Sequence, residues 1–292
     1  MREYTPDVLA DLLPYPTPNL YKYSRGRLIL VVGSRAYPGA AGLASLAGQR
    51  AGAGYTEVYV EDSIVQRVQI YAPSLVVRAW SEWDSVHWTP RADDRHPRAY
   101  VLGCGFDATD PYIANVTRQI LKRAKAPVLV DGGALQMLSA RKIHALCEPR
   151  MKDNLPTIIT PHFGEAVTLA QAYDIPTEDP TELAKELARH YHATCVLKGP
   201  NTYISDGEDC YCMTEGTAAL SKAGTGDVLS GIIGALLAQG VDPVDACVLG
   251  TTLHARAGRL AAAELTSIAV TPEDVIDYIT QAVLSLGKGR TE

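Results

Sequence analysis

The sequence predicts an α/β fold: a three-layer αβα sandwich around a mostly parallel sheet. From residue 27 onward, short apolar runs alternate with longer segments that are compatible with helices. Some runs, such as residues 28–32, are apolar at every position, which is typical of strands buried on both faces of a parallel sheet. Since no linker, repeat or low-complexity tract interrupts this alternation, we expect residues 1–292 to form one domain, with a helix and lead-in at about residues 1–26.

Apolar runs mark the expected strands, and a capping signal marks the first helix. Thr5 followed by Pro6 is a helix cap followed by a first-turn proline, so we expect a short helix that begins there and ends near Pro14. The runs predicted to be strands are residues 28–32, 56–60, 75–77, 100–102, 128–130, 157–159 and 194–197.

Two later regions depart from this alternation. Residues 78–98 carry three tryptophans and many charged residues, so we expect an irregular excursion or an edge element there. These tryptophans are Trp80, Trp83 and Trp88. Residues 226–286 are predicted to be helical almost throughout. Turn signals within them lie near Gly240, near Thr266 and at Pro272.

Composition and charge indicate a globular protein with a sizeable core, since 47% of the residues are hydrophobic and 21% are charged. The net charge is −6 and no stripe of Lys and Arg could follow a phosphate backbone, so a nucleic-acid partner is not expected. The chain shows no apolar signal region and no apolar stretch long enough to span a membrane, which predicts a cytoplasmic protein. The six cysteines form no zinc pattern and are expected to be free thiols in a reducing compartment.

The most informative segment is Gly224-Thr225-Gly226-Asp227, which opens an apolar helix. Its two glycines let backbone N–H groups converge at the helix start and form an anion hole. An aspartate beside that hole would repel a phosphate unless it acts as a general base toward a substrate hydroxyl. A simple turn with Asp227 as the helix cap explains the same residues equally well. Because the chain contains neither a P-loop nor a G-x-G-x-x-G fingerprint, its nucleotide fold must be of another kind.

A second candidate site follows the strand at residues 194–197. Its residues are Lys198, Gly199, Pro200, Asn201 and Thr202, and a hairpin is expected at residues 203–207. Ligands bind at the carboxyl ends of strands in open α/β sheets, where a lysine can neutralise a phosphate. A solvated lysine at a strand end is the alternative interpretation.

A third segment, residues 160–165, follows another strand and enters a helix. Glu165 in the first turn is ordinary compensation of the helix dipole in most proteins. With His162 beside it, the segment indicates a polar site that orients a substrate or holds a hydrated Mg²⁺ near phosphates, with Glu165 binding the ion through water. The glycines of residues 33–44 and 103–105 allow either close helix packing or the approach of a ligand to the backbone.

Six pieces of the sequence, in order, resemble the stand-alone ADP/ATP-dependent NAD(P)H-hydrate dehydratases. That family is carbohydrate-kinase-like, has a ribokinase-like fold and is also found fused to an epimerase domain, which is not expected within residues 1–292. The pieces are G-S…P-G-A-A, G-C-G, V-D-G-G-A-L, T-P-H-F-G-E, L-K-G-P-N-T and G-T-G-D-V-L-S-G, and they run from about residue 28 to the last helix.

The resemblance implies a hydro-lyase that repairs hydrated nicotinamide nucleotides. The enzyme would use ADP or ATP, with Mg²⁺, to phosphorylate the ring hydroxyl of S-NADHX or S-NADPHX and then eliminate phosphate. It also implies a homo-oligomer. It implies no preference between ADP and ATP or between the two substrates.

The resemblance also assigns roles to residues of this sequence. The catalytic base would be Asp227, and the anion hole would consist of Gly224, Thr225 and Gly226. The nucleotide would bind to Lys198, Gly199, Pro200, Asn201, Thr202 and Gly226. The hydrated nicotinamide nucleotide would contact Ala40, Gly105, His162 and Asp227. The sequence departs from the usual pattern at Thr217, Ala223 and Gly133, where the family more often has Asn, Gly and Asp.

Two other functions share some of these features. A ribokinase-like kinase of a vitamin precursor or sugar would have the same anion hole and aspartate. The sequence H-F-G-E at residues 162–165, where such kinases commonly have Asn-x-x-Glu, favours the dehydratase. A non-enzymatic nucleotide-binding protein would also keep the fold, but the combination of Asp227, Lys198 and Glu165 favours an enzyme.

Overall fold

The computed structural model describes residues 4–17, 19, 21–83 and 96–287. In this part of the chain the strands form one sheet with the order β3-β2-β1-β4-β5-β6-β7-β8-β9. Strands β1 to β7 are parallel, and β8 and β9 are antiparallel to their neighbours. The predicted mostly parallel sheet is therefore confirmed.

All the predicted strands are present, with small shifts at their ends. The strands are β1 Arg27–Val31, β2 Tyr55–Val60, β3 Val76–Ala79, β4 Arg98–Leu102, β5 Val128–Val130, β6 Thr157–Ile159, β7 Thr194–Leu197, β8 Thr202–Ser205 and β9 Cys210–Met213. The expected hairpin is formed by β8 and β9 and turns at residues 206–209, slightly later than predicted.

The described helices begin and end largely where the sequence signals lie. They are α1 Pro6–Asp11, α2 Pro38–Arg50, α3 Val65–Tyr71, α4 Pro111–Arg123, α5 Gly132–Leu138, α6 Arg141–His144, α7 Cys147–Lys152, α8 Phe163–Gln171, α9 Pro180–Tyr191, α10 Thr225–Ala238, α11 Pro243–Leu265 and α12 Pro272–Leu286. Short 3-10 turns are η1 Asp62–Ile64, η2 Trp80–Glu82 and η4 Ala218–Leu220. The Thr5 side chain caps α1 as expected, although the helix ends at Asp11, before Pro14.

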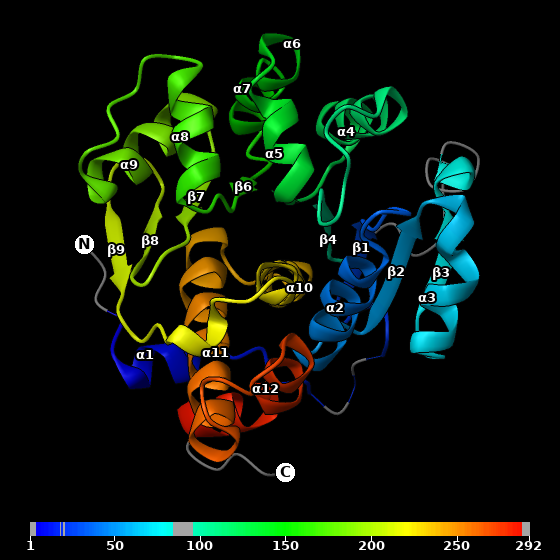
Figure 1. Ribbon diagram of the computed structural model, residues 1–292, viewed down its shortest axis with the longest axis vertical. Coiled ribbons are helices and arrows are strands. Elements are labelled where there is room, and N and C mark those ends of the chain that lie inside the picture. Colours follow the sequence, from blue (N-terminus) through cyan, green and yellow to red (C-terminus); the bar gives the residue numbers. More distant parts are fainter. Residues whose placement is uncertain (1–3, 18, 20, 84–95, 288–292) are drawn as a thin grey trace.

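Side chains of the strands alternate between two apolar cores, which produces the three layers. In β1, Leu28 and Leu30 belong to the core that includes residues of α2, α10, α11 and α12, whereas Ile29 and Val31 belong to the core that includes residues of α4, α5, α8 and α9. Figure 1 shows these two sets of helices on opposite sides of the sheet. Buried positions on both faces explain why the strands read as continuous apolar runs.

Residues 78–98 are partly an edge element, as expected. Strand β3 is the edge strand beside β2 and contains Arg78. Trp80 and Trp83 then turn inward: both are buried, and Trp83 packs edge-on against Tyr59. Trp88 lies outside the described residues.

Two further features concern the state of the cysteines and the length of the apolar helices. All six cysteines are free thiols, and Cys104, Cys147, Cys195 and Cys247 are buried. Within the described ranges, no helix is long and apolar enough to cross a membrane.

Candidate functional site

Loops that follow the parallel strands meet at the carboxyl edge of the sheet. Residues 103–105 follow β4, Asp131 follows β5, His162 lies just after β6, and Lys198 follows β7. Helix α10 packs against β4, and its Asp227 and Ser230 lie beside Asp131, so the start of α10 is at the same edge. This is the edge at which open α/β sheets bind ligands.

Glycines allow the loops after β4 and β5 to approach each other closely. Gly103 has a φ of +110°, and a Cβ atom there would lie 1.8 Å from the Asp131 carbonyl oxygen. A Cβ atom at Gly133 would lie 2.6 Å from the Phe106 carbonyl oxygen. The backbone at residue 133 therefore leaves no room for the aspartate that the family more often has there.

Asp131 is the most connected side chain of the site, although we did not single it out from the sequence. It is 3% exposed, and its carboxylate accepts hydrogen bonds from Lys198 Nζ at 2.9 Å and from Ser230 Oγ at 2.8 Å. Burial opposes ionisation, but the charge and hydrogen bonds of Lys198, Ser230 and Thr160 outweigh it and lower the pKa of Asp131. Asp131 therefore stays ionised.

Two sequence signals could have revealed this arrangement. Asp131 comes directly after a fully apolar strand, at the edge where ligands bind. Ser230 lies three residues after Asp227, and residues at that spacing share one face of a helix.

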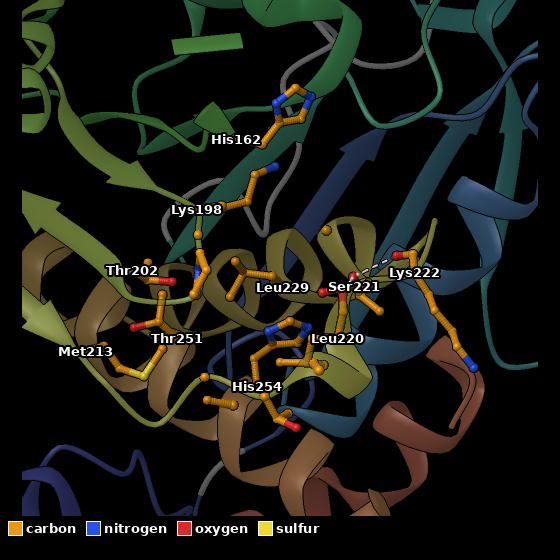
Figure 2. A pocket seen from close by; sticks show the side chains of 18 of the residues that line it. His162, Lys198, Thr202, Met213, Leu220, Ser221, Lys222, Leu229, Thr251 and His254 are labelled. Carbon is orange, nitrogen blue, oxygen red and sulfur yellow. Dashed lines mark hydrogen bonds between the residues drawn. The ribbon is translucent and has the colours of Figure 1, made fainter. Parts of the chain in front are cut away.

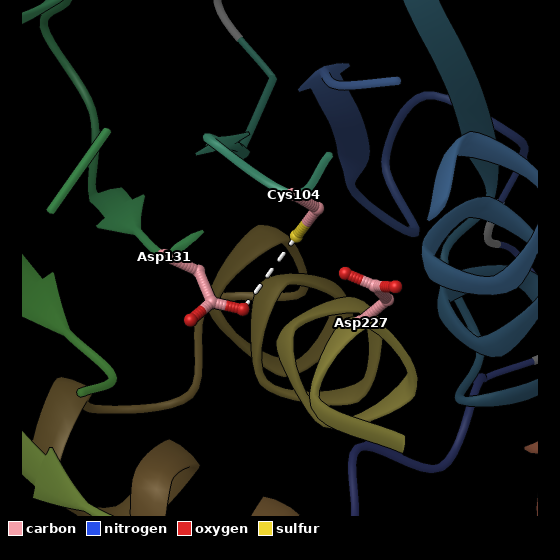
Figure 3. A group of neighbouring side chains, drawn as sticks. All are labelled: Cys104, Asp131 and Asp227. Atoms are coloured by element: carbon pink, nitrogen blue, oxygen red, sulfur yellow. Dashed lines mark hydrogen bonds between the residues drawn. The ribbon is translucent and has the colours of Figure 1, made fainter. Parts of the chain in front are cut away.

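Asp227 lies in the first turn of α10, and its side chain is close to that of Asp131. One potential metal-ligand atom from each of Cys104, Asp131 and Asp227 (the thiol sulfur or a carboxylate oxygen) lies within 4.8 Å of the other two. Figure 3 shows the three side chains pointing toward one another. Burial, reinforced by repulsion from Asp131, raises the pKa of Asp227 to about 7, although Lys198 and Cys104 act in the opposite direction. A carboxylate with such a pKa suits general base catalysis near neutral pH.

Cys104 was not predicted as a site residue either. Its thiol contacts the Asp131 carboxylate at 3.7 Å. Burial and the charges of Asp131 and Asp227 raise the pKa of Cys104 well above its usual value, so it is a neutral thiol.

The start of α10 has the geometry of an anion-binding turn. Gly224 precedes the helix with a φ of +98°, which favours glycine. Thr225 Oγ1 donates to the carbonyl oxygens of Leu220 and Lys222 at 2.7 and 2.9 Å, which fixes the turn. The first-turn N–H groups of α10 have no acceptor within their own helix and carry its positive dipole end.

Lys198 borders this turn. A Cβ atom at Gly226 would lie 3.5 Å from Lys198 Nζ, so the fold brings two separate motifs of the sequence together. Burial disfavours the charged lysine, but Asp131 and Glu165 outweigh burial and raise the pKa of Lys198. The lysine is therefore a fixed positive charge beside the first turn of α10.

A pocket of about 680 Å³ opens beside the first turn of α10 (Figure 2). Predicted site residues on its wall are His162, Lys198, Gly199, Pro200, Thr202, Gly224, Thr225 and Gly226. Asn201 is exposed and does not line this pocket. Ala223 also lines it, and Thr217 lines it while capping η4, where its Oγ1 accepts from the Ala219 N–H at 3.3 Å.

Ala40 and Gly105 lie together outside that pocket. A Cβ atom at Gly105 would lie 2.8 Å from Ala40 Cβ, and Gly105 has a φ of +71°. Gly105 is next to Cys104, which contacts the two aspartates. The structure therefore places these two residues on the β4 side of Asp227.

His162 and Glu165 cap α8. The Glu165 carboxylate accepts from the His162 N–H at 2.8 Å, and His162 Nδ1 accepts from the Glu165 N–H at 3.2 Å. Glu165 also lies 4.0 Å from Lys198 Nζ, and burial raises its pKa despite the lysine. Thus Glu165 caps the helix and also faces the site.

Comparison with known proteins relates this geometry to a family. The family model described as NAD(P)H-hydrate dehydratase matches residues 28–281. The chain belongs to this family. The bifunctional NAD(P)H-hydrate repair enzyme Nnr of Mycobacterium leprae is 35% identical over 263 residues, which are 87% of this chain and 50% of that protein. The chain thus spans about half the length of the curated relatives it matches.

Solved structures agree with this family assignment. The ADP/ATP-dependent NAD(P)H-hydrate dehydratase of Bacillus subtilis, co-crystallised with ATP/Mg²⁺, superposes with a TM-score of 0.82 at 26% identity and covers 97% of both chains. A ribokinase-like superfamily protein of Enterococcus faecalis superposes with a TM-score of 0.81 at 21% identity and covers 98% of this chain and 96% of its own. The second match concerns the fold alone, and the expected ribokinase-like fold is confirmed.

Proposed function

We propose that this member of the family is a hydro-lyase that uses ADP or ATP to dehydrate the S-epimer of NADHX or NADPHX. The observation that carries the proposal is the position of Asp227. This carboxylate, with a pKa raised to about 7, lies where the turn at the start of α10 meets the loops that carry Cys104 and Asp131. Membership of the NAD(P)H-hydrate dehydratase family supports the same chemistry.

The nucleotide occupies the pocket of Figure 2, with its terminal phosphate at the start of α10. Backbone N–H groups of the Gly224–Gly226 turn bind that phosphate, and Lys198 offsets its charge. The hydrated ring lies outside that pocket against Ala40 and Gly105, whereas His162, the third residue expected to contact it, lies on the pocket wall. This division supplies one binding region for each of the two reactants.

The reaction proceeds in two steps. Asp227 takes the proton of the ring hydroxyl, whose oxygen bonds to the terminal phosphorus while AMP leaves from ADP, or ADP from ATP. The C–O bond then breaks, phosphate departs with the electron pair, and loss of a ring proton restores the dihydropyridine. Phosphate leaves more easily than hydroxide, which is the purpose of the nucleotide.

Mg²⁺ fits the chemistry of the acidic residues beside the pocket. The carboxylates of Asp131 and Glu165 flank Lys198 Nζ at 2.9 and 4.0 Å, and carboxylate oxygens are the ligands that Mg²⁺ prefers. Asp131 is already paired with Lys198, so Glu165 would hold the hydrated ion through water. When bound, the ion would neutralise charge on the phosphates of the nucleotide.

Three expectations from the sequence accompany this proposal. The chain acts as one domain, associates with copies of itself and works on small molecules in the cytoplasm. Free, mostly buried cysteines support a reducing compartment. Light scattering after size-exclusion chromatography measures the mass directly, and a mass of one chain would contradict the expected homo-oligomer.

Recovery of dihydropyridine absorbance from S-NADHX tests the activity. We expect recovery with Mg²⁺ and either ADP or ATP, no recovery without a nucleotide, and loss of recovery in Asp227→Asn. Asp242→Asn is the matched control, because Asp242 caps α11 outside the pocket and asparagine caps equally well. No recovery with either nucleotide would refute the dehydratase and favour a small-molecule kinase.

A further inference from the structure

One buried side chain on the wall of the nucleotide pocket has no role in the reaction described above. His254 of α11 lines the pocket but is only 8% exposed. Its Nε2 atom is buried and finds no hydrogen-bond partner among the residues that the structure describes. An unpaired buried polar atom destabilises the folded protein. Packing alone would favour an apolar residue at this position.

The imidazole is neutral and has one nitrogen to offer a ligand. Burial lowers the pKa of His254 to about 4, with Lys198 adding to this effect and the Thr225 backbone opposing it. A neutral imidazole carries one N–H donor and one nitrogen that accepts a hydrogen bond. Because no described residue pairs with Nε2, this atom takes the acceptor role when a ligand supplies a donor.

The location of the ring identifies the part of the nucleotide that supplies this donor. Thr225 belongs to the turn proposed to bind phosphate, and in Figure 2 the His254 ring lies beside Leu220 on the wall of the same pocket. The group that adjoins the phosphates in a nucleotide is the ribose, which carries two hydroxyl donors. The base is attached beyond the ribose and lies farther from the phosphates.

We propose that His254 is a specificity residue for the sugar of the nucleotide, with Nε2 accepting a hydrogen bond from a ribose hydroxyl. Because Nε2 is shielded from water, side chains of the pocket wall must shift before the nucleotide can reach it. This inference rests on the proposed function, since it assumes that ADP or ATP binds in this pocket.

Calorimetric titration with ADP and with 2′,3′-dideoxy-ADP, in the presence of Mg²⁺, tests the contact. The wild type should bind dideoxy-ADP roughly three- to tenfold more weakly than ADP, as expected for one hydrogen bond. His254→Leu should bind both nucleotides with the same affinity, so the hydroxyls and the imidazole are coupled. His254→Gln keeps an acceptor and should restore part of the discrimination, which separates recognition from a folding defect.

His190→Gln is the matched control. His190 also has a buried Nε2 without a partner in the described structure, but it does not line the nucleotide pocket. Its substitution should leave the affinity for ADP and the discrimination unchanged.

Each outcome has one meaning. Equal binding of ADP and dideoxy-ADP by the wild type would overturn the inference, as would equal discrimination by the wild type and His254→Leu. If ADP still drives repair of S-NADHX in either case, the proposed function stands. If the wild type neither binds ADP nor repairs S-NADHX, the proposed function fails as well.

Discussion

Two neighbouring aspartates of the site have opposite pKa shifts. Asp131 accepts hydrogen bonds from Lys198 and Ser230, and these lower its pKa although the side chain is buried. Asp227 has neither partner, and burial together with the charge of Asp131 raises its pKa to about 7. One carboxylate is therefore a permanent anion and the other can exchange a proton near neutral pH. Groups whose surroundings separate their pKa values in this way take different roles in catalysis.

The pH dependence of kcat/KM in Asp131→Asn tests which charge raises the pKa of Asp227. In the wild type, kcat/KM should rise with pH as Asp227 loses its proton, with a midpoint near its pKa of about 7. Asp131→Asn removes the neighbouring negative charge and frees Lys198, and both changes lower the pKa of Asp227. The rising limb should therefore move to lower pH, while maximal activity falls roughly 10- to 100-fold because Lys198 loses its fixed position.

The control for this pH profile is Asp179→Asn. Residue 179 caps α9, far along the chain from Asp131 and Asp227, and asparagine retains the cap. Its profile should match the wild type. A rising limb that stays in place in Asp131→Asn would contradict the assignment of Asp131 as the charge that raises the pKa of Asp227.

At the scale of elements, the site depends on how α10 begins. Gly224 takes a left-handed conformation, and a Cβ atom there would lie 2.6 Å from Leu43 Cδ1 and 3.0 Å from Pro272 Cγ. The turn is thus wedged between α2 and α12. Lys222 secures it further by donating from Nζ to the carbonyl oxygens of Ile268 and Val270. Two helices and a loop therefore hold the turn at the start of α10 in place.

Gly224→Ala should destabilise the protein and weaken nucleotide binding. We expect a loss of about 1–3 kcal/mol in the free energy of unfolding, from backbone strain and crowding together. The affinity for ADP should fall about tenfold because the N–H groups of the turn move. Urea denaturation and calorimetric titration measure the two effects.

Gly240→Ala separates strain from crowding. Gly240 also has a positive φ, of +86°, but no atom lies within 4 Å of a Cβ atom there. It should lose less stability than Gly224→Ala and keep its affinity for ADP. Equal effects of the two substitutions would argue against the wedged turn.

At the scale of the whole molecule, the two edges of the sheet have different tasks. The carboxyl edge carries the site, whereas the amino edge contains the buried Arg150 of α7, which is 3% exposed. Its guanidinium donates to the Thr157 hydroxyl. It also donates to the carbonyl oxygens of Leu121, Ala124, Ala126 and Pro156. Arg150 thereby joins the end of α4 to the starts of β5 and β6.

Arg150→Met should therefore reduce stability without changing catalysis. Loss of these hydrogen bonds should lower the free energy of unfolding by about 2–4 kcal/mol. Activity per folded molecule should remain at the wild-type level, since the edge is opposite the site. Lys152→Met on the same helix removes only an exposed pair with Glu148 and should change stability by less than about 0.5 kcal/mol. A large fall in activity of the folded Arg150→Met protein would contradict this separation.

The sequence by itself determined the strands, the main helix boundaries and the motifs. Burial on both faces leaves continuous apolar runs, and caps such as Thr5 act within a few residues, so both are visible locally. Only the tertiary structure decided that Lys198 pairs with Asp131, 67 residues away, and that Gly226 lies beside that lysine. The raised pKa of Asp227 and the neutral His254 likewise depend on burial and on charges from distant segments. Such effects act through space, and no local pattern along the chain records them.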